Sequence, residues 1–387
     1  MKNTFPLALL GAALASSLPA MAQDPVRIGF ITTLSTPAGY LGEDARDAFR
    51  LAMEQQGNTL GGVPVELVVE DDGLQPATGK QIADRMSLDG ISLYTGVIFS
   101  NVLAAVVNTA VKNDGFYLSN NPGPSNLAGE QCMPHYFAAA YQNDVPHEMA
   151  GLAANDLGYK NMVILAPNYQ AGRDALAGFK RTFKGHVTEI YTKLNQLDFS
   201  VELARIRSQA PDAIYQLHPG GAGINFAKQY GSSGLNKSVP MLVPIFSMDE
   251  RILSATGKVA EGVNIVSGWN PQSDNPVNQA FVKAFNEKYN RAPTVYAAQA
   301  YDTAHLIGSA LKATNGNLKD PQAFRAALRA ARFDSVRGEF RFGNNQNAVI
   351  DWHLLRVEAD AQGKLVEVLV KTIAKAQVDS YAAKCAM

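Results

Sequence analysis

Apolar runs of strand length alternate with apolar positions at helical spacing over the first third of the chain. The pattern predicts strands at 26–34, 63–69, 91–98 and up to 119, with helices at 42–56, 76–88 and from 100 onward. Strict alternation of this kind is typical of a parallel sheet that is covered by helices on both faces. The sequence therefore predicts a doubly wound α/β unit.

The alternation stops at a Gly- and Pro-rich stretch and then starts again. After 123–134 the pattern predicts a strand at 135–141 and a helix at 143–158. Further strands are predicted at 162–166, 187–191, 213–218, 241–246 and 263–269, and the helices between them at 172–183, 200–208, 222–230 and 249–255. The second half of the pattern thus predicts a second unit of the same architecture.

The last part of the chain departs from the alternation. From Pro276 the pattern of apolar positions predicts three helices, the last two at 294–314 and 321–332. The pattern then predicts β segments at 338–343, 349–357 and 365–373. Helices without strands between them do not build a sheet, so we expect them to cover the first sheet. The predicted N-terminal lobe is 24–142 with 272–345, and the predicted C-terminal lobe is 143–271 with 346–387. The fold class is then α/β, with two doubly wound parallel-sheet lobes joined by a three-strand hinge around a cleft.

The N-terminal residues 1–22 have the pattern of a cleaved secretory signal. Lys2 precedes an apolar run, and the stretch ends in the small residues Ala20-Met21-Ala22. No later run reaches the 18 or so uninterrupted apolar residues that a membrane helix needs, so direct membrane insertion is not expected. The sequence therefore predicts an exported protein.

Charge and cysteine content exclude several classes of partner. The 387-residue chain has a formal net charge of -1 and no basic block, which argues against nucleic acid. Its two cysteines are Cys132 and Cys385. In an exported protein such a pair is more typical of a disulfide than of a metal site, although spacing alone does not prove that the two meet.

Motifs for catalysis and for cofactors are missing from the sequence. It has no G-x-S-x-G and no phosphate-binding G-x-x-x-x-G-K-[ST], and His147-Glu148 lacks the second His of a zinc helix. Gly220-Gly221-Ala222-Gly223 follows a strand but lacks the third Gly of a dinucleotide site. We therefore expect no enzyme, no cofactor and no metal.

Small polar side chains follow two neighbouring predicted strands. Ser100 and Asn101 stand where a helix begins, and Asn120 and Asn121 follow the next strand. Parallel strands end at one edge of the sheet, where open α/β sheets bind ligands. The Ser100 hydroxyl and the free N–H groups at the helix start can hold a carboxylate, and the alternative is that Ser100 is only an N-cap.

Four segments in this order carry a resemblance to a known family: VRIGFITTLSTPAGYLGEDARDAFRLAMEQQ, SNNPGPSNLAGEQC, VILAPNYQAGRDALAGFK and TVYAAQAYDTAHLIGSAL. Over nearly all of its mature length the chain resembles the type I periplasmic solute-binding proteins of ABC importers, the branched-chain amino-acid-binding family. NNPGPSNLAGEQC, together with a Cys near the C-terminus, is similar to the subgroup that takes up aromatic acids. The resemblance implies a Venus-flytrap fold, a periplasmic monomer without catalysis, and delivery of a ligand to membrane permease subunits.

The resemblance also implies a set of ligand-binding positions in the loops after strands. They are Tyr40, Phe99, Ser100, Asn101, Asn120, Asn121, Tyr141, Tyr169, His218, Phe246 and Trp269. For Phe246 and Trp269, packing in the core is the alternative.

The expected ligand class depends on Phe246. It falls at or near the position where amino-acid-binding members place an acid for the ligand ammonium, so a ring with a carboxylate and no amine is favoured. We expect a small aromatic carboxylate of the hydroxybenzoate or hydroxycinnamate type, held by Ser100 and backbone N–H groups rather than by Arg173. A branched-chain or other amino acid is the alternative, since Asp249 can reach inward, and a periplasmic sensor subunit is another.

Overall fold

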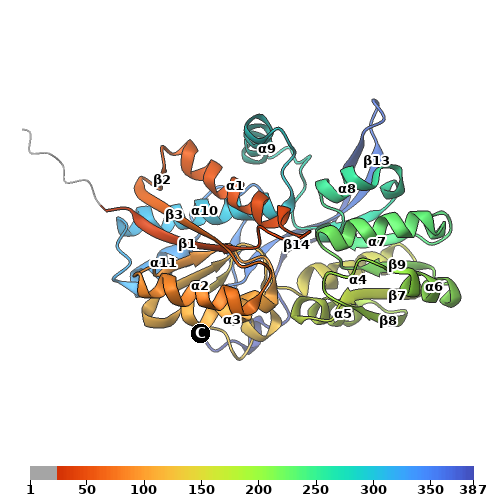
Figure 1. The fold of residues 1–387 in the computed structure, drawn as a ribbon, viewed down its shortest axis with the longest axis horizontal. Helices are drawn as coiled ribbons and strands as arrows, with labels where there is room; N and C mark the ends of the chain where they lie inside the picture. The colour runs from red at the N-terminus through yellow and green to blue at the C-terminus, as the bar shows by residue number, and fades with distance from the viewer. Residues whose placement is uncertain (1–23) are drawn as a thin grey trace, which may run out of the picture.

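The computed structural model describes residues 24–387, and the predicted signal at 1–22 lies outside them. Two α/β lobes lie side by side, and the chain passes between them more than once (Figure 1). The lobe boundaries predicted near 142, 272 and 346 stay a prediction.

The N-terminal lobe is built on a six-stranded sheet with the order β2-β3-β1-β4-β5-β6, in which only β2 runs antiparallel to its neighbour. Its strands are β1 (Val26–Thr32), β2 (Thr59–Leu60), β3 (Val63–Asp71), β4 (Leu93–Thr95), β5 (Phe116–Ser119) and β6 (Tyr136–Ala138). Its helices are α1 (Tyr40–Gln55), α2 (Pro76–Leu88), α3 (Ser100–Ala110), α9 (Pro276–Tyr289), α10 (Val295–Thr314) and α11 (Pro321–Ala330).

The C-terminal lobe is built on an eight-stranded sheet with the order β12-β13-β11-β10-β9-β7-β8, and β14 pairs with β13. Its strands are β7 (Asn161–Pro167), β8 (His186–Thr192), β9 (Ala213–Gln216), β10 (Met241–Pro244), β11 (Asn264–Ser267), β12 (Arg341–Phe342), β13 (Ala348–Ala359) and β14 (Leu365–Gln377). Its helices are α4 (Val145–Asp156), α5 (Gln170–Thr182), α6 (Ser200–Gln209), α7 (Gly221–Ser232) and α8 (Glu250–Thr256). Strands β7 to β11 are parallel, and β13 runs antiparallel to β11.

Helix α10 returns from the second half of the chain to cover the first sheet, as expected. It packs along α1, and most of its side chains are buried. A Cβ at Gly61, beside β2, would lie 2.0 Å from the carbonyl oxygen of Gly308 on α10, and only glycine permits this approach. Helix α10 thus packs on a sheet formed by the first part of the chain, which explains why no strands alternate with the helices of this region.

Several strands are shorter than the pattern predicted, and β1, β6, β9, β10 and β11 each end two or three residues early. The strand predicted at 91–98 extends only over β4, because Gly96 adopts φ +104° and turns the chain out of the sheet. Phe99 is then the N-cap of α3, and Ser100 is its first helical residue. The alternative that Ser100 is only an N-cap is therefore wrong. The β segment predicted at 338–343 is reduced to β12.

A buried ion pair ties one crossing segment to the N-terminal lobe. Arg337 and Asp302 pair at 2.7 Å, and both side chains are about fully buried. The guanidinium also donates to the carbonyl oxygens of Ala139 (2.9 Å) and Ala140 (2.6 Å). A buried charge that is both paired and hydrogen-bonded holds its neighbours in one arrangement, so residues 139–140 are fixed before the chain enters the C-terminal lobe.

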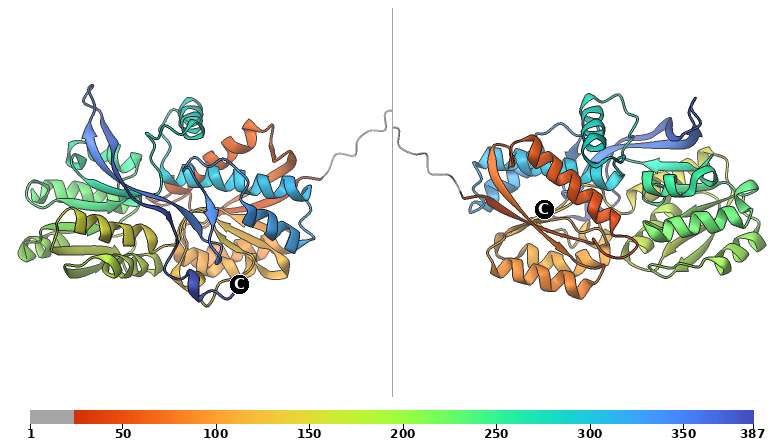
Figure 2. Two further views of the ribbon diagram at one scale, coloured as in Figure 1. Left: turned by 180° about the vertical axis from the view of Figure 1, so that it is seen from behind. Right: turned by 45° about the horizontal axis from the view of Figure 1, so that its top comes forward.

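The end of the chain lies against the N-terminal lobe. Seen from behind, the tip of the β13–β14 hairpin lies at the C-terminal lobe, and the chain then returns to end against the N-terminal lobe (Figure 2). Cys385 is bonded there to Cys132, with the two Cα atoms 5.8 Å apart. The expected disulfide is thus present, and it fixes the C-terminus to the turn before β6.

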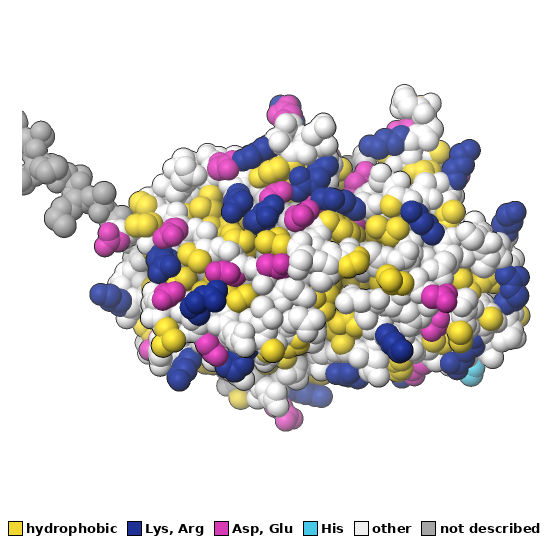
Figure 3. All heavy atoms as spheres, in the orientation of Figure 1, with side chains coloured by type: hydrophobic (Ala, Val, Ile, Leu, Met, Phe, Trp, Pro, Cys, Tyr) yellow, Lys and Arg dark blue, Asp and Glu magenta, His cyan; other side chains and the backbone are white. Residues whose placement is uncertain are grey.

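The surface bears charges of both signs, as Figure 3 shows for one face. This agrees with a formal net charge of -1. Within residues 24–387, no helix combines the length and the apolar character needed to cross a bilayer.

Candidate ligand-binding site

A small cavity lies between the lobes at the carboxyl ends of β4 and β5. The N-terminal lobe lines it with Phe99, Ser100, Asn121 and Tyr296. The C-terminal lobe contributes His147, Tyr169, Leu217 and Phe246, and Tyr141 and Asn143 stand where the chain crosses. The lobes are closed over it, with about 30 Å³ of free space. We call this the neutral cavity.

Aromatic rings from both lobes form the walls of the neutral cavity. Tyr141 and Phe246 stack with their centroids 4.9 Å apart, and Phe246 also lies 5.9 Å from Tyr296. Phe99 and Tyr169 face each other across the lobes at 6.4 Å. Paired aromatic faces favour an additional flat ring through offset and edge contacts.

The polar end of the neutral cavity is the start of α3. Ser100 Oγ accepts a hydrogen bond from Asn143 Nδ2 at 3.2 Å, which leaves its own O–H free to donate. The first backbone N–H groups of a helix have no partner within the helix, and the helix dipole favours an anion beside them. Asn121 is oriented by donating to the carbonyl of Ile98 (2.7 Å) and accepting from the hydroxyl of Tyr141 (3.1 Å). This end can hold a carboxylate.

No charged side chain of the described residues lines the neutral cavity. Burial lowers the pKa of His147 to about 3, so its ring is neutral, and it hydrogen-bonds to Tyr215. Burial likewise raises the pKa of Tyr141 and of Tyr296 well above the usual range, which keeps their hydroxyls protonated. The cavity therefore offers neutral donors and acceptors only.

The structure places the predicted positions in two groups. Phe99, Ser100, Asn121, Tyr141, Tyr169 and Phe246 line the neutral cavity. The other five, Tyr40, Asn101, Asn120, His218 and Trp269, do not.

Three residues of the second group, Asn120, His218 and Trp269, make contacts within the protein instead, whereas Asn101 lines a neighbouring cavity. His218 is buried in the C-terminal lobe, where its ring contacts Thr192 (2.9 Å) and Gln216 (2.8 Å). Asn120 accepts from the N–H of Gly96 at 2.9 Å and fixes the loop that follows β4. The indole N–H of Trp269 donates to Asn278 at 2.7 Å. The polar groups of His218 and Trp269 are thus used within the protein, as is the side-chain oxygen of Asn120, whose Nδ2 has no partner in the described chain.

Eight lining residues were not predicted from the sequence: Ile98, Pro122, Asn143, His147, Ala171, Leu217, Pro219 and Tyr296. Tyr296 lies in the first turn of α10, inside a segment that carried the family resemblance, and a helix start at a sheet edge is a signal that points to it. His147 was weighed only as a zinc ligand. Leu217 directly precedes a predicted position.

The closed lobes also touch at the rim of the cleft. Tyr40 donates to Asp249 Oδ2 at 2.8 Å, and Arg251 Nη2 lies 3.0 Å from Asp44 Oδ1. The guanidinium of Arg251 lies over the ring of Tyr40, 5.0 Å from its centroid. Each of these contacts joins α1 to the start of α8, so each exists only while the lobes are closed.

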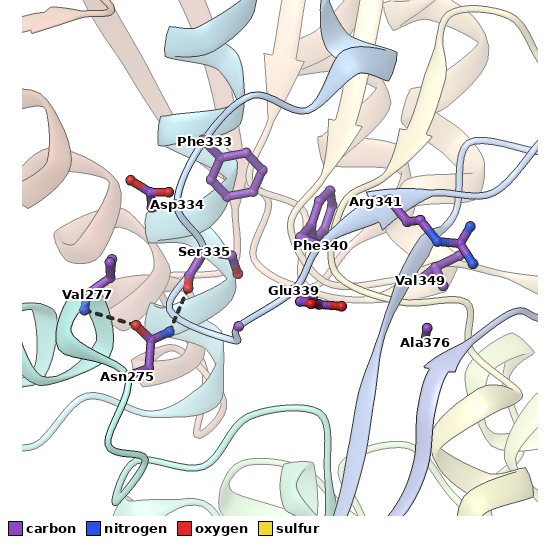
Figure 4. A pocket seen from close by; sticks show the side chains of 11 residues that line it. Asn275, Val277, Phe333, Asp334, Ser335, Glu339, Phe340, Arg341, Val349 and Ala376 are labelled. Atoms are coloured by element: carbon purple, nitrogen blue, oxygen red, sulfur yellow. Dashed lines mark hydrogen bonds between the residues drawn. The ribbon is translucent and has the colours of Figure 1, made fainter.

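A larger groove of about 530 Å³ lies outside the cleft, next to β12 and the start of α9 (Figure 4). It is lined by Phe333, Phe340 and Arg341, and its central amide is already engaged. Asn275 accepts from the N–H of Val277 (3.0 Å) and donates to the carbonyl of Ser335 (2.9 Å). The groove is not at the carboxyl ends of the parallel strands, where open α/β sheets bind ligands.

A family model described as periplasmic binding protein matches residues 25–364. The chain belongs to this family. Its members are binding components of transport systems, so the expectation that the chain is not an enzyme is confirmed, as is the predicted fold.

Solved structures of the family resemble the chain along nearly its whole length. An ABC-transporter solute-binding protein from R. palustris, in complex with benzoate, is 28% identical and covers 92% of this chain and 99% of its own, with a TM-score of 0.88. Another from Rhodopseudomonas palustris BisB5, in complex with 3,4-dihydroxy benzoic acid, is 26% identical over 92% and 99%, with a TM-score of 0.85. Among curated proteins, a Leu/Ile/Val-binding protein homolog from Brucella melitensis is 27% identical over 87% of this chain and 88% of its own.

Proposed function

We propose that this periplasmic binding protein captures a small aromatic carboxylate of the hydroxybenzoate or hydroxycinnamate type. The closed complex is then delivered to the permease subunits of an ABC importer. In this proposal residues 1–22 direct export to the periplasm, and the protein acts as a monomer. The observation that carries the proposal is a closed cavity with aromatic walls from both lobes, neutral polar groups and a helix start at one end.

The stacked pair Tyr141 and Phe246 suggests how the ring is received. In the closed form each ring covers one face of the other, and only about 30 Å³ of the cavity remains free. We infer that the ligand ring stacks on one of these faces. An open cleft would expose the faces of both Tyr141 and Phe246, and closure over the ligand ring would replace the lost stacking contact. Closure then depends on the ligand because contacts to it are made only in the closed form.

The polar end sets the orientation of the ligand. A carboxylate at the start of α3 accepts from the Ser100 hydroxyl and from backbone N–H groups, and charge-assisted hydrogen bonds of this kind are the strong ones. Arg173 does not line the neutral cavity: its guanidinium contacts Asn168 at 3.2 Å, and it lines a neighbouring cavity that also reaches Ser100 and Tyr169. The benzoate and dihydroxybenzoic acid ligands of the two R. palustris structures support this class of ligand.

An amino acid is the second candidate, and the name of the Brucella relative favours it. Asp249 was the acid expected to hold its ammonium, but both of its oxygens are engaged. Oδ1 accepts from the N–H groups of Arg251 and Ile252 at 3.0 Å each, and Oδ2 accepts from Tyr40. Asp249 does not line the neutral cavity, so an ammonium beside Phe246 would lack an anion.

A thermal-shift panel of 4-hydroxybenzoate, 4-hydroxycinnamate, L-leucine and L-valine tests the proposal. A ligand present at about 100 times its dissociation constant adds about 2.7 kcal/mol to the free energy of unfolding. We expect the aromatic acids to raise the melting temperature and the two amino acids to leave it unchanged. Stabilisation by leucine or valine alone would overturn the aromatic assignment.

A further inference from the structure

A second cavity lies between the lobes, on the side of α9. It has a volume of about 210 Å³ and is bounded by α9 of the N-terminal lobe and by the starts of α8 and β14 in the C-terminal lobe. Three carboxyl groups line it, those of Asp249, Glu250 and Glu367. We call it the acidic cavity. Because both lobes supply its walls, it is complete only in the closed form.

Glu367 is a buried acid without a full set of partners. Its side chain is 3% exposed, and its Oε2 has no hydrogen-bond partner in the described chain. Burial, together with the nearby Glu250 and Asp249, raises the pKa of its carboxyl well above the usual range. A buried polar atom without a partner is costly, and here it lines a cavity with room for one.

The charges around the acidic cavity do not balance. Lys364 is the single basic residue in the lining, and it forms no ion pair with the three acids. Three carboxylates against one ammonium leave two negative charges when all are ionised. Protonation relieves part of this excess, and a bound cation would relieve it as well.

The spacing of the acids argues against a bare metal ion. No group of three or more acidic, His or Cys side chains within residues 24–387 is arranged to hold a metal. The remaining walls combine the amides of Gln272 and Asn286 with apolar side chains that include Trp269, Val282, Pro293 and Val366. An indole face attracts organic cations, and apolar walls accept a hydrocarbon chain. The cavity therefore matches an ion that carries separated charges on an apolar body.

We propose that the acidic cavity binds a small organic diammonium ion, with N–H donors directed at Glu367 and Glu250 and its methylene chain against the apolar walls. The ion favours the closed form, because only that form brings α9 against α8 and β14. It would thereby strengthen capture of the ligand in the neutral cavity without touching it, and by linkage that ligand would strengthen binding of the ion equally. The proposal does not depend on which ligand the neutral cavity takes.

Binding of the ion should depend on pH. The groups that face these acids are Lys364 on the hairpin and, around Asp249, Tyr40, Asp44 and Arg251. Burial raises the pKa of Glu367 and of Glu250, so as the pH falls a proton competes with the ion at both carboxyl groups. The affinity for a diammonium should therefore increase between about pH 6 and about pH 8.

Calorimetry of the full exported chain with 1,4-diaminobutane tests this proposal. We expect binding that is tighter at about pH 8 than at about pH 6 and is not reproduced by sodium or magnesium chloride at equal ionic strength. Glu367→Gln keeps the shape of the protonated acid but removes its charge, and it should weaken binding at least about tenfold. Glu358→Gln is the matched control, since Glu358 is exposed on the adjacent strand β13 and should bind the diamine like the parent.

Glu250→Gln provides a second variant should Glu367→Gln fail to fold, because Glu250 is only partly buried. It too is expected to weaken diamine binding. Absence of diamine binding at both pH values, magnesium binding as tight as the diamine, or undiminished affinity in the folded variants would each overturn the proposal. None of these outcomes bears on aromatic-acid binding, which the thermal-shift panel measures separately.

Discussion

The two cavities between the lobes are closed by the same movement but differ in the charge of their walls. In the neutral cavity every lining group is uncharged, and a helix start supplies the donors. In the acidic cavity three carboxyl groups converge with one lysine. One closing movement can therefore bury ligands of opposite charge at two places, each matched by local chemistry rather than by the overall charge of the protein.

Replacing Phe246 by an acid should have the largest effect, because it would place a charge in the wall of the neutral cavity. Phe246→Asp puts a carboxylate into the neutral cavity, where it would repel the ligand and lack a partner, and an uncompensated buried charge costs about 3 to 5 kcal/mol. We expect affinity for 4-hydroxybenzoate to fall by more than about a hundredfold in calorimetry.

Phe246→Leu is the matched control for this substitution. It keeps an apolar wall and removes the aromatic contacts with Tyr141 and Tyr296, and one such pair is worth about 0.5 to 1.5 kcal/mol. A loss of about two- to tenfold is expected. Equal losses in the two variants would mean that charge is not what separates the two cavities.

Asp249, which lines the acidic cavity, should make the free energy of unfolding depend on pH. Its folded pKa of about 7 lies above its unfolded value, so the folded state holds the extra proton between about pH 4 and about pH 7. Stability from this group is therefore lost as the pH rises, by up to about 1.4 kcal/mol per pH unit. Asp249→Asn cannot ionise and still caps α8, so urea unfolding should show the variant gaining stability relative to the parent as the pH rises. A constant difference from about pH 5 to about pH 8 would contradict the burial of this acid.

Replacing Arg251 should have the smallest effect on ligand affinity, because its side chain contacts the ligand of neither cavity. Arg251→Met removes the pair with Asp44 that joins the lobes, and a partly exposed pair is worth about 0.2 to 1 kcal/mol. Ligand affinity should fall up to about fivefold. Arg291 also pairs with Asp44 but within the N-terminal lobe, so Arg291→Met should reduce stability without changing closure. Equal affinity losses in both variants would show that the rim contact does not control closure.

The sequence predicted the architecture well because the spacing of apolar residues within each segment distinguishes strands from helices. The alternation of strands and helices, and their grouping into two units, both agree with the structure. The disulfide was indicated by context rather than geometry, and the structure forms it. The N-cap alternative for Ser100 failed because Phe99 is the N-cap of α3, and periodicity does not fix a helix boundary to one residue.

The details of the site were predicted less completely, for a physical reason. Whether an aromatic residue after a strand faces the cleft or the core depends on which partner its polar atom finds, as with Trp269 and Asn278. Tyr296 reaches the cavity only because α10 returns to the first lobe from far along the sequence. The acidic cavity combines α8, α9 and β14, and no local pattern marks such a combination.

The central claim is that a carboxylate is held at the start of α3 by neutral donors. Calorimetry with benzoate and its uncharged isostere benzamide, on the parent and on Ser100→Ala and Arg173→Ala, tests it most directly. We predict that Ser100→Ala weakens benzoate binding by about 1.5 to 3 kcal/mol, or roughly ten- to a hundredfold, and removes most of the preference over benzamide. Arg173→Ala should change neither quantity. Normal benzoate binding by Ser100→Ala, with binding lost in Arg173→Ala, would contradict the account and place the carboxylate in the second lobe.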